Sequence, residues 1–261
     1  MSITDSSNLI YGVNAVVEAL RAGTRQIESV TVLESARPDR LKSLIELARQ
    51  KGVPVHRVPR LDLDRSMGEL RHQGVVARIA AARYADADQL IDQLEAKIGT
   101  ADPPLALGLD AIEDPRNMGS ILRTAECSGV HGVFIAERRA VGLTGVVAKV
   151  AAGALEYVPV ARVTNLVRLI EQLKARNIWV VGAAGEARQS YVDWDWTLPA
   201  AIFVGSEGHG LHRLVREHCD TLVRIPVCGK LESLNVSVAA GVLLYEARRQ
   251  RTLAAGKRNQ P

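Results

Sequence analysis

Three short segments of this chain gather residue types that can act on a polar ligand, and the densest lies at residues 205–210. It holds three glycines within six positions, together with Ser206 and Glu207. Such density costs conformational entropy, so it favours either a close backbone approach to a ligand or a tight strand-to-helix turn. Glu207 would also suit the start of a following helix. The spacing G-x-x-G-x-G is not the G-x-G-x-x-G of dinucleotide sites, which disfavours a dinucleotide-dependent dehydrogenase.

The other polar candidates stand at the starts of apolar helical stretches. Asn117 precedes one such stretch, where its amide could cap the helix and also face a ligand. Arg123 lies within that stretch as a lone charge among aliphatic residues. A guanidinium stays protonated at neutral pH, so it suits binding a phosphate better than removing a proton. Ser233 and Asn235 precede a second long apolar stretch, and spacing alone makes either its N-cap.

The histidines and cysteines do not indicate a metal site. His209 and His212 are spaced i, i+3 without a third ligand nearby, so their spacing does not support a shared metal. The chain has an odd number of cysteines and no C-x-x-C pair: Cys127, Cys219 and Cys228. A disulfide framework and a zinc site are therefore unexpected, and a reducing, cytoplasmic location is predicted.

Alternating strands and helices must position these residues. Five apolar runs lack a polar face and predict strands buried on both sides, at 105–110, 132–136, 178–183, 200–205 and 221–227. Helical stretches lie between and after them, at 118–128, 146–155, 165–176, 211–218 and 234–249. This alternation predicts a parallel sheet covered by helices on both faces. A smaller α/β domain precedes it, with helices at 11–21 and 39–51 and strands at 29–33, 53–58 and 74–80.

Composition and charge fit one or two globular domains. The 261 residues are 47% apolar and 24% charged, no apolar run is long enough for a membrane helix, and the start shows no secretory signal. The net charge is +4, and arginine outnumbers lysine, which suits phosphate binding but also follows from GC-rich codon usage. An acidic stretch ending in Asp102-Pro103-Pro104 separates a basic first block from the rest. We expect a linker there.

Three long segments together resemble a known family. Residues 110–125, 203–211 and 225–239 are similar to the three motifs of the SpoU (TrmH-type) RNA ribose 2′-O-methyltransferases of the SPOUT superfamily, in the family's order and spacing. Residues 10–16 and 72–75 resemble the two ends of that family's small substrate-binding domain, which is similar to ribosomal protein L30e. The resemblance covers residues 8–251.

The resemblance implies a domain plan and a site. It implies an L30e-like RNA-binding domain at 8–84, an acidic linker at 85–103, a methyltransferase domain with a C-terminal trefoil knot at 104–251, and a basic tail at 252–261. It implies a homodimer with S-adenosylmethionine as cofactor and no metal. Because the implied substrate is RNA, we interpret His209 and His212 as surface or RNA-facing residues. The implied catalytic residues are Asn117, Arg123, Glu207, Ser233 and Asn235, and the implied cofactor-binding residues are Gly205, Ile225 and Leu234.

The similarity extends to a subgroup and a reaction. The subgroup that fits best comprises bacterial enzymes that methylate a guanosine of the peptidyl-site loop in 23S ribosomal RNA. In that reaction a ribose 2′-oxygen attacks the sulfonium methyl in line, so the protein has to align the reactants, stabilise negative charge and remove a proton. Three alternatives stay open: the same methylation on transfer RNA, resistance methylation of an antibiotic target loop, and a non-catalytic RNA-binding protein with the same fold.

Overall fold

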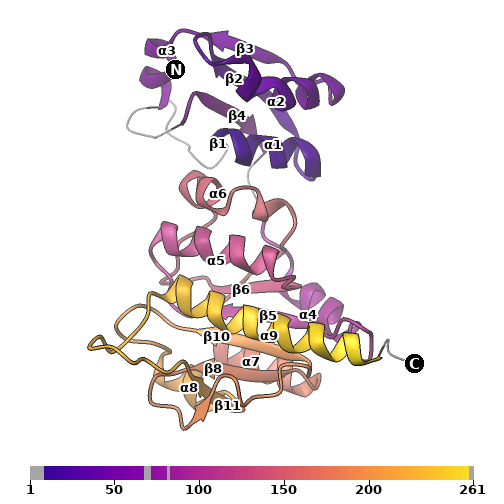
Figure 1. The fold of residues 1–261 in the computed structure, drawn as a ribbon, viewed down its shortest axis with the longest axis vertical. Helices are drawn as coiled ribbons and strands as arrows, with labels where there is room; N and C mark the ends of the chain where they lie inside the picture. The colour runs from indigo at the N-terminus through magenta and orange to yellow at the C-terminus, as the bar shows by residue number, and fades with distance from the viewer. Residues whose placement is uncertain (1–8, 68–71, 81–82, 259–261) are drawn as a thin grey trace. The chain divides into compact units, whose positions relative to one another are not determined.

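The computed structural model describes residues 9–67, 72–80 and 83–258, which form two compact units (Figure 1). The first unit runs to Arg83 and also includes Gly142–Tyr157, and the second comprises Tyr84–Val141 and the chain from Val158 onward. Residues 8, 68–71 and 81–82 of the predicted first domain, and 259–261 of the predicted tail, lie outside the described residues. No helix within the described ranges is long and apolar enough to cross a membrane.

The first unit is built on a mixed four-stranded sheet in the order β1-β4-β2-β3. Its strands are β1 (Leu9–Tyr11), β2 (Ile27–Leu33), β3 (Val55–Val58) and β4 (Val75–Ile79). Helices α1 (Val13–Ala22) and α2 (Pro38–Gln50) share one apolar core with one face of the sheet, while α3 (Arg60–Met67) packs on the opposite face. The sequence predicted α1 and α2 but not α3, whose polar composition hides its two buried residues, Leu63 and Met67.

A segment from the middle of the chain completes the first unit. It holds α6 (Gly145–Ala151) and a 3₁₀ turn (Ala154–Glu156). Ala148 packs into the core of the first unit, and the buried Glu156 carboxylate accepts hydrogen bonds from Thr24 and Arg25. This segment lies within the range 104–251 expected for the methyltransferase domain, and its contacts place it in the first compact unit.

The same segment also breaks the single helix expected at 146–155. The backbone turns at Ala152 and Gly153, whose φ angles of 51° and 101° are left-handed. A Cβ at Gly153 would lie 2.3 Å from the Cβ of Glu18, so only glycine fits this turn against α1.

The second unit carries a seven-stranded sheet, parallel throughout, in the order β7-β6-β5-β10-β8-β11-β9. The strands are β5 (Leu105–Leu109), β6 (Gly132–Ala136), β7 (Val160–Val163), β8 (Trp179–Ala183), β9 (Gln189–Ser190), β10 (Ala200–Val204) and β11 (Thr221–Arg224). The predicted parallel α/β architecture is confirmed. The trefoil knot stays a prediction.

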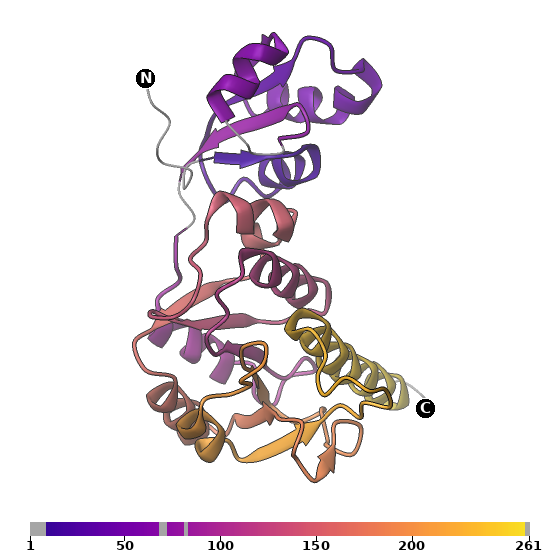
Figure 2. The same ribbon diagram turned by 90° about the vertical axis from the view of Figure 1, so that its left-hand side faces the viewer.

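Helices cover both faces of this sheet (Figures 1 and 2). On one face, α4 (Ala87–Glu95), α7 (Leu166–Ala175) and α8 (Arg213–His218) share a core with the strands. On the other, α5 (Pro115–Cys127) packs against the long C-terminal helix α9 (Val236–Arg258).

The acidic stretch 85–103, expected to be a linker, contributes helix α4 to the second unit. Leu90, Ile91 and Leu94 are buried in its core, and Asp86 caps the helix by accepting a hydrogen bond from Gln89 N at 2.9 Å. The acidic residues lie on the solvent side of an amphipathic helix. The net negative charge of this stretch suggested a linker, although its buried apolar residues have the spacing of one face of a helix.

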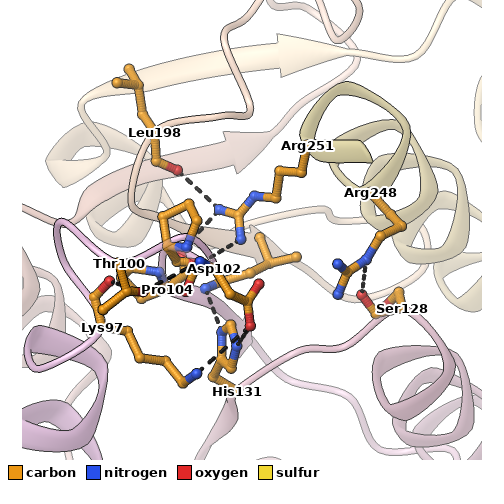
Figure 3. A network of polar contacts seen from close by, with 11 residues as sticks. Lys97, Thr100, Asp102, Pro104, Ser128, His131, Leu198, Arg248 and Arg251 are labelled. Carbon is orange, nitrogen blue, oxygen red and sulfur yellow. Dashed lines mark hydrogen bonds and ion pairs between the residues drawn. The ribbon is translucent and has the colours of Figure 1, made fainter. Parts of the chain in front are cut away.

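A buried arginine fastens α9 to the sheet (Figure 3). Arg251 is 7% exposed, and its guanidinium donates to the carbonyl oxygens of Pro103 (2.5 Å), Pro104 (3.0 Å), Trp196 (2.9 Å) and Leu198 (3.0 Å). Burial lowers its pKa to about 10, which still leaves it charged at neutral pH. One guanidinium thereby joins the C-terminal helix to the starts of β5 and β10.

Candidate active site

The candidate residues converge at the carboxyl edge of the second sheet. Helix α5 begins just beyond β5, with Pro115 at its first position and Asp114 as its cap, since Asp114 Oδ1 accepts a hydrogen bond from Arg116 N at 2.7 Å. Asn117 follows in the first turn and is therefore not the cap that its position suggested. Its amide is left to face the site.

Three side chains from distant segments form one polar cluster. Asn117 Nδ2 donates to Glu207 Oε1 at 3.2 Å, and Asn235 Nδ2 donates to Asn117 Oδ1 at 3.0 Å and also to Glu207 Oε1. Asn235 Oδ1 accepts from the backbone N–H groups of Ser237 at 3.0 Å and Val238 at 3.4 Å. Asn235 therefore caps α9 and belongs to the cluster, which combines the two roles that its sequence position allowed.

The glycine loop after β10 folds back on itself. Ser206 N donates to Gly210 O at 3.1 Å, and Gly210 N donates to Ser206 O at 2.9 Å. A Cβ on Gly205 would lie 2.0 Å from the carbonyl carbon and oxygen of Gly210, closer than real Cβ contacts. The loop can therefore adopt this shape only with glycine at position 205.

A cavity of about 400 Å³ lies against this loop. All three predicted cofactor-binding residues, Gly205, Ile225 and Leu234, line it. Apolar side chains form part of its wall, while Ser233, Glu186 and Arg216 supply polar groups. This combination fits a nucleoside with a charged amino-acid tail, since binding cavities pair apolar walls with a few polar anchors.

The structure does not bring Arg123 to this cluster within one chain. It lies six residues beyond Asn117 on α5, which places it about 120° further round the helix. Its side chain is exposed, and within the described ranges no hydrogen bond or ion pair joins it to Asn117, Glu207 or Asn235. Glu207, one of the implied catalytic residues, accepts from the two asparagine amides.

A second cavity, of about 630 Å³, shares Asn117 and Glu207 with the cluster and Ser206 with the first cavity. His212, interpreted above as a surface or RNA-facing residue, also lines it. The Asp110 carboxylate is buried and accepts twice from that residue, from His212 N at 2.7 Å and from His212 Nδ1 at 2.9 Å. Sequence reasoning missed this pair because its members are 102 residues apart. The available signal was an acid directly after one strand and a histidine at a helix start near the neighbouring strand's end.

Among the described residues, the cysteines are free thiols and the potential metal ligands form no cluster. Burial raises the pKa of the Cys219 thiol to about 12, so it stays protonated at neutral pH. Cys127 and Cys228 are exposed free cysteines. No group of three or more potential ligands among the described residues could hold a metal ion.

Comparison with known proteins identifies both parts of this architecture. The SpoU rRNA Methylase family model matches residues 104–245, and the model for RNA 2′-O ribose methyltransferase substrate binding matches residues 9–85. The fold and the site thus define an RNA ribose methyltransferase. The chain belongs to the SpoU rRNA methylase family.

Named relatives align over nearly the whole chain. YacO of Bacillus subtilis, named only as a TrmH family tRNA/rRNA methyltransferase, is 46% identical over 95% of this chain and 98% of its own. The 23S rRNA (guanosine-2′-O-)-methyltransferase RlmB of Pseudomonas putida is 44% identical, over 93% of this chain and 96% of its own.

Solved structures agree with this assignment. The SpoU methyltransferase AviRb of Streptomyces viridochromogenes is 28% identical and covers 95% of this chain and 91% of its own, with a TM-score of 0.77. AviRb has also been solved in complex with the cofactor AdoMet, at a TM-score of 0.74. S-adenosylmethionine is the cofactor of this family, and the enzyme transfers a methyl group to RNA.

Proposed function

We propose that this enzyme methylates the ribose 2′-oxygen of a guanosine in the peptidyl-site loop of 23S ribosomal RNA, in the cytoplasm. The observation that carries the proposal is the Asn117–Glu207–Asn235 cluster beside a cavity lined by Gly205 and Leu234. The choice of 23S RNA and of guanosine as the target rests on the names of the RlmB relatives, which align with nearly the full chain, including the substrate-binding unit.

Different residues of the chain bind the cofactor and position the ribose in this proposal. When bound, S-adenosylmethionine supplies a methyl group on a sulfonium that can leave as a neutral thioether. Gly205, Ile225 and Leu234 hold the cofactor, with the backbone and apolar surfaces reading the flat adenine. Asn117 uses one amide hydrogen to bind Glu207 and donates the other to a ribose oxygen, while Asn235 and Glu207 fix the orientation of Asn117. Ser233 adds a hydroxyl at the wall of the cofactor cavity.

Arg123 grips the RNA phosphate next to the target and stabilises the developing alkoxide. Its exposure on α5 suits contact with a second macromolecule better than a role within its own chain. In this proposal Arg123 comes close to an active site only in the homodimer with RNA bound.

Exposed apolar side chains on α9 support a homodimer formed through this helix. Ala240, Leu243 and Leu244 are buried, but Val238 and Tyr245, seven residues apart on one stripe, are 50% and 53% exposed. Light scattering should report a dimer, and a stable 28.3 kDa monomer at micromolar concentration would contradict this.

Transfer RNA is the second candidate substrate, since the name of YacO leaves both RNAs open. The substrate-binding unit favours ribosomal RNA. A solved TrmH/SpoU tRNA modifying enzyme from A. aeolicus covers only 64% of this chain, at a TM-score of 0.53.

Tritium transfer from labelled S-adenosylmethionine tests the function. We expect label in a 23S RNA transcript and none in transfer RNA. Glu207→Ala should lower the rate about 10²-fold because both amides lose their anchor. Glu217→Ala, which removes an exposed carboxylate paired with Arg213 on α8, is the matched control and should keep the wild-type rate. Label in neither RNA would favour a non-catalytic RNA-binding protein.

A further inference from the structure

The proton of the attacking 2′-hydroxyl needs an acceptor, and the predicted site residues do not provide a good one. Arg123 carries a guanidinium, which has no free base at neutral pH. Asn117 and Asn235 are amides. Glu207 Oε1 already accepts from both of them, which suits Glu207 to holding the cluster in place.

The pair formed by Asp110 and His212 has the geometry of an oriented base. Asp110 follows β5, and its N–H donates to Val204 O at 2.9 Å, so the carboxylate is fixed at the sheet edge. His212 directly precedes α8, and its backbone N–H and ring Nδ1 both contact that carboxylate, at 2.7 and 2.9 Å. A carboxylate only accepts, so the proton of the neutral ring lies on Nδ1 and leaves Nε2 as an acceptor.

The free Nε2 atom of His212 belongs to a ring that lines the second cavity. The His212 side chain is 48% exposed while that of Asp110 is 6% exposed, so the base reaches solvent and its orienting group does not. Within the described residues, no side chain or backbone group bonds to Nε2. The 630 Å³ cavity that His212 lines is the one that also exposes Asn117 and Glu207.

We propose that His212, held by Asp110, is the general base that takes the 2′-hydroxyl proton. This rests on the proposed function. The oxygen–methyl bond forms as the methyl–sulfur bond breaks, the electron pair of the broken bond stays on sulfur, and the proton moves to Nε2. Asp110 is a positioning residue that sets the tautomer and stabilises the resulting imidazolium.

Other charged groups face the same cavity and influence this proton. They are Glu113 and Asp114 after β5, Arg139 after β6, and Glu207 and His209 from the glycine loop. The carboxylates favour the imidazolium product, and Arg139 opposes it. His209 lines the cavity too, but no carboxylate among the described residues orients it, so it lacks the defined tautomer of His212.

Single-turnover methylation measured across roughly pH 5.5 to 9 tests the proposal. His212→Asn places an amide N–H where Nδ1 stood, which keeps the bond to Asp110 and removes the base. We expect its plateau rate to fall about 10²–10⁴-fold and the rising limb of the wild-type profile to disappear. The affinities for S-adenosylmethionine and RNA should not change.

Two further variants sharpen the test. Asp110→Asn should lose the same limb, and added imidazole should restore part of the rate to His212→Gly. His218→Asn, the same substitution at the end of α8 and outside the cavity, should behave as wild type.

Persistence of the limb in His212→Asn would overturn the proposal, whether or not the protein melts at a lower temperature. A lower melting temperature with the limb kept would show that the pair only clamps α8 to the sheet. Activity of the wild type on an RNA other than 23S would refute the substrate alone, because the pH comparison runs on whichever RNA is methylated. A wild type without activity on any RNA would refute both.

Discussion

Replacing the buried Arg251 by methionine should destabilise the second unit strongly. The guanidinium donates to four carbonyl oxygens, and only one of them, Pro104 O, has another described donor, Ala200 N at 3.0 Å. Arg251→Met keeps most of the packed volume but leaves three carbonyls without the donor they have in the described residues. Each bond to a charged donor contributes roughly 1.5–3 kcal/mol, and such terms do not add fully, so we expect a loss of about 3–5 kcal/mol.

The assay is thermal unfolding followed by circular dichroism at fixed protein concentration. For a unit of this size, one kcal/mol shifts the melting temperature by about 2–4 °C, which predicts a fall of about 6–20 °C. The melting temperature of Arg251→Lys should lie between those of the wild type and Arg251→Met, because an ammonium cannot reach all four carbonyl oxygens at once.

The matched control is Arg213→Met on α8, where the side chain of an exposed arginine pairs, among the described residues, only with Glu217 on the same helix. It should stay within about 2 °C of the wild type. An Arg251→Met protein that melts within that same margin would show that water replaces the guanidinium, and would refute the reasoning.

Three further predictions concern the site and its support. Gly205→Ala forces the glycine loop open, so calorimetry should show at least about tenfold weaker cofactor binding, whereas Gly229→Ala, with open space around its Cβ, should bind as wild type. Arg123→Ala should lower the methylation plateau by about 10²–10³ while the midpoint of the pH–rate limb stays in place; a lost limb with unchanged RNA affinity would make Arg123 the base. Burial lowers the pKa of His131, whose Nδ1 accepts a hydrogen bond from Leu105 N at 3.0 Å. The unfolded chain therefore binds a proton at this histidine more readily than the folded chain, and the melting temperature should fall as the pH drops below about 6.5. An equal fall in His131→Gln would exclude this cause.

The framework of the second unit was predictable because its strands are continuous apolar runs. A strand such as Leu105–Leu109, with every residue buried, differs in sequence from any amphipathic element. The predicted helix at 165–176 is also present as α7, with Asn165 as its cap, accepting from Val167 N at 2.8 Å.

What escaped prediction depends on contacts between distant segments. Helix α4 was hidden by its net charge, although Leu90 and Leu94 have helical spacing. The assignment of Gly142–Tyr157 to the first unit depends on Glu156 meeting Arg25, 131 residues away. No local pattern encodes such a pairing.

The candidate site was predictable only in part, and through the family motifs. They named Asn117, Glu207 and Asn235, which the structure brings into contact. They did not indicate His212, since its significance comes from the carboxylate of Asp110, which follows β5 and lies 102 residues away in the chain.

The most direct test of the proposed function is to map 2′-O-methyl groups in total RNA from a strain lacking this gene. The account predicts that one guanosine in the peptidyl-site loop of 23S RNA loses its methyl group, and that the wild-type gene restores it while one encoding Asn235→Ala does not. An unchanged 23S profile with a methyl group missing from transfer RNA would contradict the proposed substrate. A profile unchanged in every RNA would contradict the proposed activity.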